Sequence, residues 1–285
     1  MELTIFDVGH GFCALLRCDN GNCILFDCGR DDETGFRPST YLPAIGVRSL
    51  EELVITNFDA DHVADLANLL QCVRVETLFR NGSISAAQLT GIKLNAGFLP
   101  AGMRAALKMH ETYIEPIVNP PDLAGVQIRH FCNPYPRFTT TNDLSLVSFV
   151  LYDGIGIVFP GDLEKAGWEA LLEVPDFRAW LNVVTIFIAS HHGRESGYCA
   201  EVFDYCSPQI VILSDKEIQH ETQRHCYDEH ATGIQWTSNT SVSTRYVLTT
   251  RKDGHIRINK NLGSVYRVTS YGSQPPDFLG AAAAF

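Results

Sequence analysis

The sequence lacks any uninterrupted apolar run long enough to span a bilayer. A membrane-spanning helix needs about 20 consecutive, predominantly apolar residues. The opening residues, Met-Glu-Leu-Thr-Ile-Phe-Asp, also have neither the basic region nor the apolar stretch of a secretory signal. We therefore expect a cytoplasmic protein with no membrane partner.

Positive charge is also scarce in this chain. The 285 residues include 22 Lys and Arg against 33 Asp and Glu, which gives a formal net charge of −11. An acidic surface repels a polyanion unless metal ions or a local basic patch reverse the sign where contact is made. The balance disfavours a protein that simply coats nucleic acid, while 45% hydrophobic residues are enough to form a folded core.

Cysteines at the short paired spacing of a zinc knuckle are missing as well. The chain has nine cysteines, and four of them, Cys13, Cys18, Cys23 and Cys28, follow one another at intervals of five. Zinc knuckles instead use pairs that are two to four residues apart. We interpret these cysteines as small apolar side chains buried in strands of a reduced protein.

Apolar runs of strand length recur along the chain and alternate with helical patterns. The runs LTIFDVG and CILFDCG flank a turn at Asn20-Gly21, a dipeptide typical of hairpins. Two later runs, VVTIFIAS and PQIVILSD, have the length of central strands. Because no repeat, charge block or low-complexity linker divides the chain, we predict one layered α/β domain over residues 1–270.

Two segments depart from this regularity. Residues from about 81 to 136 are punctuated by Gly, Pro and Asn around one predicted helix near Met103 to Thr112. We expect them to be an insertion that lies over the core and shapes access to the site. Residues 271–285 are predicted to form a flexible tail.

A dense group of polar residues directly follows the predicted strand that ends at Thr56. Asn57, Asp59, Asp61 and His62 place four potential ligands within six residues, at the entrance of a helix predicted by the apolar spacing from Val63 to Leu70. Carboxylate and imidazole groups are ligands for divalent cations. The alternative is an Asp-rich helix cap, in which Asp59 or Asp61 only accepts backbone N–H bonds.

Two distant segments favour the metal site over the cap. Asp162 ends the apolar run that finishes in FPGD, and the pair His191-His192 ends the run that finishes in SHHG. Sheets of α/β proteins build their sites where strands end. Three strands that each end in ligand-type residues therefore predict one shared site for a divalent metal.

The order of these motifs resembles that of the metallo-β-lactamase superfamily, and within it the branch typified by the C-terminal domain of the competence protein ComEC. The resemblance covers most of the chain through DVGHG, FDCG, TNFDADH, NDLSLV, FPGDL, SHHG, PQIVILS and TTRKDGHIRI. It implies a four-layer αβ/βα sandwich with one or two metal ions at its edge.

The resemblance also implies the ligands of the second metal position of this family. Asp61, His62, Asp162 and His192 match that position, with Asp162 where a carboxylate bridges two ions. His192 is favoured over His191 because it directly precedes the glycine. His191 is then left to contact the substrate or the leaving group.

The first metal position is where this chain departs from the family. Asn57 stands where the first histidine of the metal motif is usual, Asp59 agrees with the ComEC branch, and Asn142 falls where a third histidine is normal. These oxygen donors are weak ligands for zinc but acceptable for manganese or magnesium. The expected cofactor is therefore one or two divalent ions, Zn²⁺ or Mn²⁺, with Mg²⁺ as a further option.

Other residues receive smaller roles. Asp7 and Asp27 look like the aspartates that brace loops in this family. His10 and Phe12 replace the Gln and Asp usual in the branch, so the resemblance assigns them no role. His220 follows the ILS strand, where the branch often places an active-site histidine.

Three functions are compatible with the sequence. The first is a metal-dependent phosphodiesterase or nuclease that acts on nucleic acid or a nucleotide, with Asp59 or Asp162 orienting the attacking water. The second is a hydrolase of a small ester, phosphoester or lactone. The third is a catalytically degenerate subunit that binds a partner protein in a larger assembly, which Asn57 favours. The acidic charge favours a small substrate or a basic surface supplied by a partner, and the fold alone does not decide.

Overall fold

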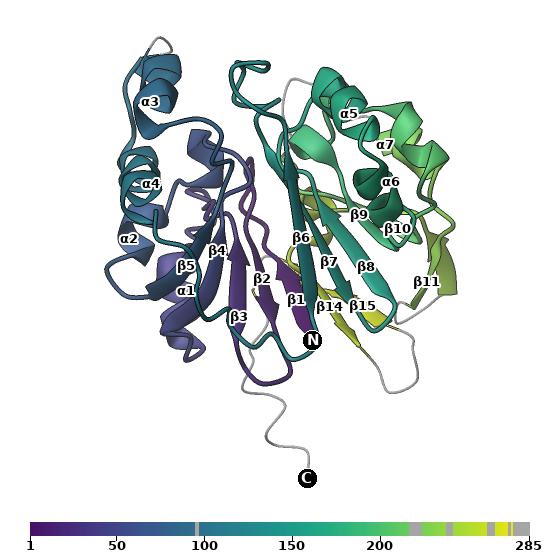
Figure 1. The fold of residues 1–285 in the computed structure, drawn as a ribbon. Helices are drawn as coiled ribbons and strands as arrows, with labels where there is room; N and C mark the ends of the chain where they lie inside the picture. Colours follow the sequence, from purple (N-terminus) through teal and green to yellow (C-terminus); the bar gives the residue numbers. More distant parts are fainter. Residues whose placement is uncertain (95–96, 217–223, 238–241, 261–265, 273–274, 276–285) are drawn as a thin grey trace.

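The computed structural model describes the whole chain except residues 95–96, 217–223, 238–241, 261–265, 273–274 and 276–285. Two β-sheets face each other, and helices cover the outer face of each sheet (Figure 1). The result is the four-layer sandwich that the family resemblance implies. None of the described helices is long and apolar enough to cross a membrane.

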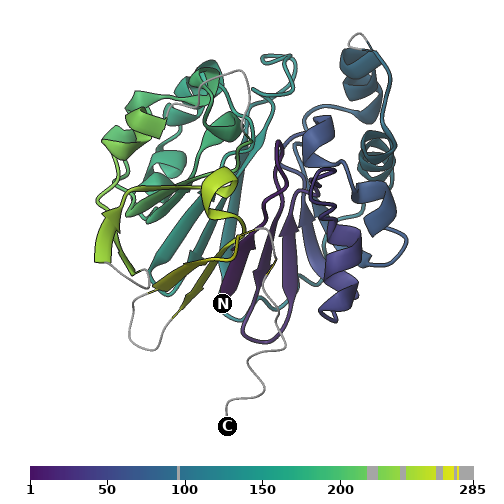
Figure 2. The same ribbon diagram turned by 180° about the vertical axis from the view of Figure 1, so that it is seen from behind.

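The first sheet has seven strands in the order β15-β14-β1-β2-β3-β4-β5. Strands β1 to β3 form an antiparallel meander, and the predicted turn at Asn20-Gly21 connects β2 to β3. Figure 2 shows from behind that β14, from the C-terminal part of the chain, lies beside β1 and that β15 follows at the edge of the sheet. The strand bounds are Glu2–Ile5 (β1), Ala14–Arg17 (β2), Cys23–Phe26 (β3), Ser49–Val54 (β4), Arg74–Phe79 (β5), Ile256–Lys260 (β14) and Tyr266–Ser270 (β15).

The second sheet has six strands in the order β13-β10-β9-β8-β7-β6. Strands β8, β9, β10 and β13 are parallel, so their carboxyl ends lie at the same edge of the sheet. The bounds are Gln127–Cys132 (β6), Leu146–Tyr152 (β7), Ile155–Phe159 (β8), Ile186–Ile188 (β9), Ile210–Leu213 (β10) and Val247–Thr249 (β13). A separate two-stranded sheet pairs β11 (Ile234–Thr237) with β12 (Val242–Arg245).

The helices separate into two sets along the chain. Helices α1 to α4 cover the first sheet, and α5 to α7 cover the second (Figure 1). Their bounds are Pro38–Ala44 (α1), Leu66–Leu69 (α2), Ala86–Leu94 (α3), Ala101–Thr112 (α4), Lys165–Leu172 (α5), Pro175–Leu181 (α6), Arg224–Asp228 (α7) and Thr250–Asp253 (α8); short 3-10 turns lie at Ala60–His62 (η1), Ser190–Gly193 (η2), Glu195–Gly197 (η3) and Ala200–Asp204 (η4).

The main core lies between the two sheets. Alternate residues of each strand point inward, as the period of a β-strand requires, so Ile24 and Phe26 of β3 pack in one cluster with Ile157 and Phe159 of β8. The rings of Phe26 and Phe159 stack with their centroids 4.1 Å apart. Each buried ring of this kind stabilises the fold by about 1.5–3 kcal/mol. This packing fixes the ends of β3 and β8 relative to each other.

The predicted burial of the regularly spaced cysteines is confirmed. Cys13, Cys18, Cys23 and Cys28 are all buried, and all nine cysteines of the chain carry free thiols. Cys13, Cys23 and Cys28 pack in the cluster beneath the helices of the first sheet. They act there as small apolar side chains.

The structure corrects the expectation that residues 81–136 lie over the core as an insertion. The helix expected near Met103 to Thr112 is present as α4, but Met103 and Met109 are part of the core cluster beneath the first sheet's helices. Strand β6 also pairs with β7 and forms the edge of the second sheet. The frequent Gly, Pro and Asn residues hid these elements and α3, because they mark the connections between short elements.

Two further predictions meet the structure only in part. The helix expected from Val63 to Leu70 is reduced to α2, because η1 precedes it and already contains His62. Of the predicted tail, Gly272 forms an isolated bridge with Gly254, and most of the residues after Gly272 lie outside the described part of the chain. His220 also lies outside the described residues.

Candidate metal centre

Four side chains meet at one end of the sandwich, where loops leave both sheets. Asp61 and His62 lie in η1 after β4, Asp162 follows β8, and His192 lies in η2 after β9. Each contributes a ligand-type atom, and these atoms all lie within 4.8 Å of one another. We call these residues the four-residue group. The predicted second metal position thus has a common centre in three dimensions.

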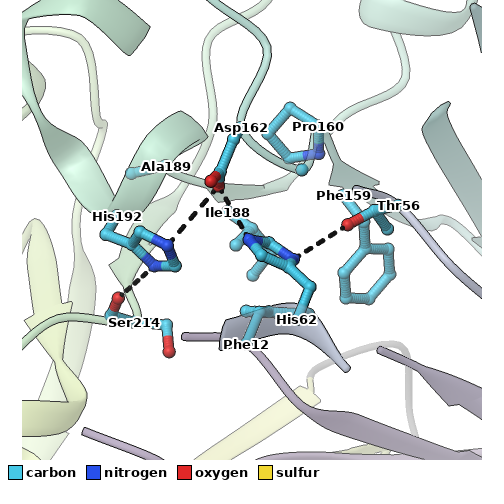
Figure 3. A pocket seen from close by; sticks show the side chains of 11 residues that line it. Phe12, Thr56, His62, Phe159, Pro160, Asp162, Ile188, Ala189, His192 and Ser214 are labelled. Carbon is cyan, nitrogen blue, oxygen red and sulfur yellow. Dashed lines mark hydrogen bonds and ion pairs between the residues drawn. The ribbon is translucent and has the colours of Figure 1, made fainter. Parts of the chain in front are cut away.

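Asp162 lies between the two histidines of the four-residue group (Figure 3). Its Oδ1 lies 3.0 Å from Nε2 of His62 and 3.5 Å from Nε2 of His192. The Oδ2 of Asp61 lies 3.3 Å from Nε2 of His192. Asp162 and both histidines are buried, while Asp61 is partly exposed and leaves one side open.

The far side of each imidazole ring is held by another group of the protein. Nδ1 of His62 lies 2.7 Å from Oδ2 of Asp27, and Nδ1 of His192 lies 2.9 Å from the carbonyl oxygen of Ser214. Because both partners are acceptors, each Nδ1 carries the hydrogen and donates it. Such partners orient metal-binding histidines and fix their tautomer.

The surroundings of the Nε2 atoms of His62 and His192 show whether the site fits a metal ion. Both are buried, and neither has a hydrogen-bond partner among the described residues, although each lies within ion-pair distance of Asp162. A buried polar atom without a partner is costly and points to a missing ligand. Two imidazole nitrogens and two carboxylates suit Zn²⁺ or Mn²⁺. The residues present therefore fit a divalent metal ion.

The electrostatics of the group lead to the same conclusion. Burial alone would lower the pKa of His62 and His192, but the carboxylates beside them outweigh it and raise the pKa of both. In turn, burial would raise the pKa of Asp61 and Asp162, but the histidines hold the pKa of both carboxyl groups low. A divalent ion would take the place of two protons and leave the local charge balanced.

Two glycines allow the backbone at Asp61 to come close to the neighbouring loops. A Cβ atom on Gly11 would lie 2.5 Å from the carbonyl oxygen of Asp61, and one on Gly29 would lie 2.7 Å from the same atom. Gly11 also has a φ of +133°, which favours glycine. The glycines of the DVGHG and FDCG motifs thus make room for the loop that carries Asp61 and His62.

The turn at SHHG sends its two histidines in different directions. His191 and His192 both have positive φ, 49° and 57°, a region that non-glycine residues seldom adopt. The backbone N–H of His191 donates to the carbonyl oxygen of Gly161, which links this turn to the loop of Asp162. His192, and not His191, belongs to the four-residue group.

Asp27 and Asp7 brace loops, as their positions in the resemblance imply. Asp27 is fully buried and accepts a hydrogen bond of 2.7 Å from the backbone N–H of Thr56 as well as the one from His62. Asp7 accepts a hydrogen bond from the backbone N–H of Gly9. Asp27 therefore joins the end of β4 directly to a candidate ligand.

The predicted ligands of the first metal position contact protein groups instead. We use this name for the place of Asn57, Asp59 and Asn142. The side-chain amide of Asn57 donates to Oδ1 of Asn142 at 3.1 Å. Asp59 forms an ion pair with Lys93 and accepts a hydrogen bond of 3.1 Å from Thr141. Asp59 is not part of the four-residue group.

His191 is held by polar side chains at the rim of the site. Its Nδ1 lies 2.9 Å from Ser196 Oγ and 3.4 Å from Glu164 Oε1, and its Nε2 lies 3.3 Å from the Arg194 guanidinium. A guanidinium only donates, so Nε2 of His191 is the acceptor and Nδ1 carries the hydrogen. Burial, followed by smaller effects that include the nearby His192 and Arg194, lowers its pKa.

Three residues near the site received no role from the sequence. His10 lies 3.3 Å from Oδ2 of Asp61, its ring is 4.4 Å from that of His192, and Arg194 donates to its Nε2. Arg194 follows SHHG directly, so its position was a usable signal. Lys93 lies on α3, far in sequence from every motif, and no pattern in the sequence points to it.

An apolar floor lies beneath the polar groups (Figure 3). Phe12, Phe159 and Ile188 line a small pocket together with His62 and His192. Such a floor keeps water away from one side of the imidazole rings and strengthens the electrostatic interactions above it. Phe12, which received no role from the sequence, belongs to this floor.

Comparison with known proteins identifies the class. Residues 6–191 match the model of the metallo-β-lactamase superfamily, which is well over half of the chain. The chain therefore belongs to this superfamily. Its fold and its four-residue group define a metallo-β-lactamase-fold hydrolase with a candidate His/Asp metal site.

More particular similarities are distant. The chain is 25% identical over 177 residues to ComE operon protein 3 of Bacillus subtilis, covering 61% of this chain and 21% of that protein. It is 26% identical over 215 residues to the competence protein ComA of Neisseria gonorrhoeae, covering 74% of this chain and 26% of that protein. The chain thus spans about a quarter of the length of the curated relatives that it matches.

A solved structure supports the fold. The metallo-β-lactamase fold protein YhfI of Bacillus subtilis superposes with a TM-score of 0.51 at 11% identity, covering 90% of this chain and 99% of that one. At this identity the match supports the fold alone. The chain is therefore a ComEC-like member of the superfamily by sequence and a metallo-β-lactamase sandwich by structure.

Proposed function

We propose that the protein is a metal-dependent phosphodiesterase whose substrate is a nucleotide or a nucleic acid. The observation that carries the proposal is the pair of buried Nε2 atoms of His62 and His192, which lack a hydrogen-bond partner among the described residues and face two carboxylates. A divalent ion bound there would supply a Lewis acid that activates water and neutralises developing charge. The protein's own groups orient the reactants around it.

Asp162 is the better candidate for orienting the attacking water. Asp59 was the other candidate, but its carboxylate is already engaged by Lys93 and by the hydroxyl of Thr141. Asp162 instead pairs with the two imidazoles at the centre of the four-residue group. A carboxylate in that place can accept a hydrogen bond from the attacking water and so orient it.

The charges around the site support an anionic substrate. Lys93, from the helices of the first sheet, and Arg194, from the loops of the second, place two fixed cations near Asp59 and His10. A negatively charged substrate would be attracted to these two cations in a chain whose net charge is −11. This arrangement favours a phosphodiester over a neutral ester or lactone, and a small one over long duplex DNA.

A substrate screen tests the proposal. Bis(p-nitrophenyl) phosphate, p-nitrophenyl phosphate and p-nitrophenyl acetate would be compared with Mn²⁺, Zn²⁺ and Mg²⁺, with wild type and with Asp162→Asn. We expect hydrolysis of the diester that requires metal and is lost in Asp162→Asn. Faster hydrolysis of the acetate than of either phosphate ester would contradict the proposed substrate class.

The hydrogen bond between Asn57 and Asn142 is the observation that favours a non-catalytic binding role instead. It links two residues at the first metal position and occupies the side-chain oxygen of Asn142, one of the donors that a two-metal enzyme could use. The same screen separates the two functions. Metal binding at full occupancy with no hydrolysis of any ester would assign the protein to the binding role.

A further inference from the structure

Lys93 contacts the residue that the family would use as a ligand for a first metal ion. Its ammonium forms an ion pair with Asp59 and donates a hydrogen bond of 2.8 Å to the hydroxyl of Thr141. Thr141 in turn donates to Asp59 at 3.1 Å. The three side chains form a closed triangle, with a cation at one corner.

This ion pair differs from an ordinary surface salt bridge in its burial. The Lys93 side chain is 12% exposed and that of Asp59 is 28% exposed, whereas the pair of Lys165 and Glu169 has 54% and 55% exposure. A buried ammonium needs compensating partners, because removing it from water is costly. Asp59 and Thr141 are the partners that compensate the buried ammonium of Lys93.

Lys93 also lies beside the loop that carries half of the four-residue group. Its partner Asp59 directly precedes η1, the turn that contains Asp61 and His62. The ammonium therefore stands next to the candidate metal centre. A second divalent ion beside Asp59 would meet this positive charge and be repelled.

We propose that the Lys93 ammonium takes the place of the first metal ion, so that the protein binds one divalent ion and uses Lys93 as its second fixed cation. The proposal rests on the proposed function for the role of Lys93 toward substrate, which is to bind an anionic oxygen of a phosphate group. An ammonium has three N–H donors, and the described part of the chain shows partners for two of them, Asp59 and Thr141. The third is available for such an oxygen.

The chain retains enough oxygen donors to test the replacement. Oδ1 of Asn57 is buried and has no hydrogen-bond partner among the described residues. Without Lys93, this oxygen and the carboxylate of Asp59 are free to bind a hard divalent ion such as Mn²⁺. Removing the lysine should therefore create a second, weak manganese site that wild type lacks.

Manganese stoichiometry is the first measurement, and it needs no substrate. Wild type, Lys93→Met, Lys108→Met and the double variant Asp59→Asn/Lys93→Met would be titrated with Mn²⁺ and analysed by native mass spectrometry. Lys108 is the matched control, because it is an exposed lysine on the neighbouring helix α4. We expect one ion in wild type, in the control and in the double variant, but two in Lys93→Met.

Several outcomes would overturn the replacement. If wild type binds two manganese ions, that result alone overturns the proposal, even if Lys93→Met fails to fold. The proposal is also overturned if Lys93→Met folds but binds only one manganese ion per chain at millimolar Mn²⁺. A second ion that persists in the double variant would show that Asp59 is not its ligand.

Binding of inorganic phosphate tests the role toward substrate. At a manganese level that fills one site, we expect both Lys93 variants to bind phosphate about tenfold or more weakly than wild type, the effect of losing one charged hydrogen bond. Unchanged phosphate affinity would contradict this role. Neither measurement depends on turnover. If the protein shows these results but hydrolyses no phosphodiester, the proposed function is refuted, while the proposal that Lys93 replaces the first metal ion stands.

Discussion

Asp27 holds His62 from behind, with its Oδ2 2.7 Å from Nδ1 of the imidazole. We expect Asp27→Asn to weaken metal binding by about 10–100-fold, because groups behind a ligand commonly contribute that much. Affinity would be measured by competition with a chromogenic chelator, with Asp7→Asn as the control. Asp7 braces a turn through the backbone of Gly9 and not through a ligand of the four-residue group. Equal affinities in both variants would show that Asp27 does not orient His62.

The four-residue group makes a direct prediction about metal content. We expect Asp61→Ala combined with His192→Ala to abolish binding of a transition metal, because it removes two of the four donors. His191→Ala should retain the metal, since His191 contacts Ser196 and Arg194 instead. Elemental analysis of the purified variants, with circular dichroism as a check on folding, measures both. Full metal content in the double variant would refute the site.

Glu52 predicts how stability depends on pH. It is buried in β4, its Oε2 has no hydrogen-bond partner among the described residues, and burial followed by the nearby Glu51 raises its pKa from 4.5 to about 7. The folded state therefore binds this proton more tightly than the unfolded state. The stability that this gives is present below pH 4.5 and is lost as pH rises through about 7.

Glu52→Gln should remove this loss. We expect the variant to exceed wild type in unfolding free energy by up to about 3 kcal/mol at pH 8.5, with a much smaller difference at pH 5. Urea unfolding at the two pH values measures the change, and exposed Glu173→Gln is the control. A variant with the same pH profile as wild type would show that Glu52 is not held neutral by the fold.

The close contact at Gly29 leads us to expect a steric effect on the loop that carries Asp61 and His62. A Cβ there would lie 2.7 Å from the carbonyl oxygen of Asp61, whereas a Cβ on Gly82 would meet no atom of the described residues within 4 Å. We expect Gly29→Ala to destabilise the protein by about 1–3 kcal/mol, the usual effect of overpacking, and to weaken metal binding by moving Asp61. Thermal unfolding and metal titration compare it with Gly82→Ala. Equal values for both variants would show that the Asp61 loop adapts freely.

The fold was predictable because its local signals agree with one another. The turn at Asn20-Gly21 and the apolar runs around it predict a hairpin that the structure contains. The segment from 81 to 136 was less predictable, since α3, α4 and β6 are short and are separated by residues that also mark loops. Only packing against distant strands shows that Met103 is buried.

The candidate site was predictable to the extent that its residues lie at strand ends. Asp162 and His192 follow parallel strands, so their proximity follows from the topology of the sheet. Lys93 lies on a helix with no motif, and its contact with Asp59 depends on how α3 packs. His10 was set aside because it departs from the family pattern, yet it contacts Asp61. Where a residue differs from the family pattern, as His10 does, the pattern gives no information about its role.

Anomalous diffraction from crystals grown with Mn²⁺ or Zn²⁺ is the most direct test of the metal centre. The structure predicts one anomalous peak, within about 2.0–2.2 Å of Nε2 of His62 and His192 and of the carboxylates of Asp61 and Asp162. No peak among these four residues, or a peak held by Asn57, Asp59 and Asn142 in its place, would contradict it.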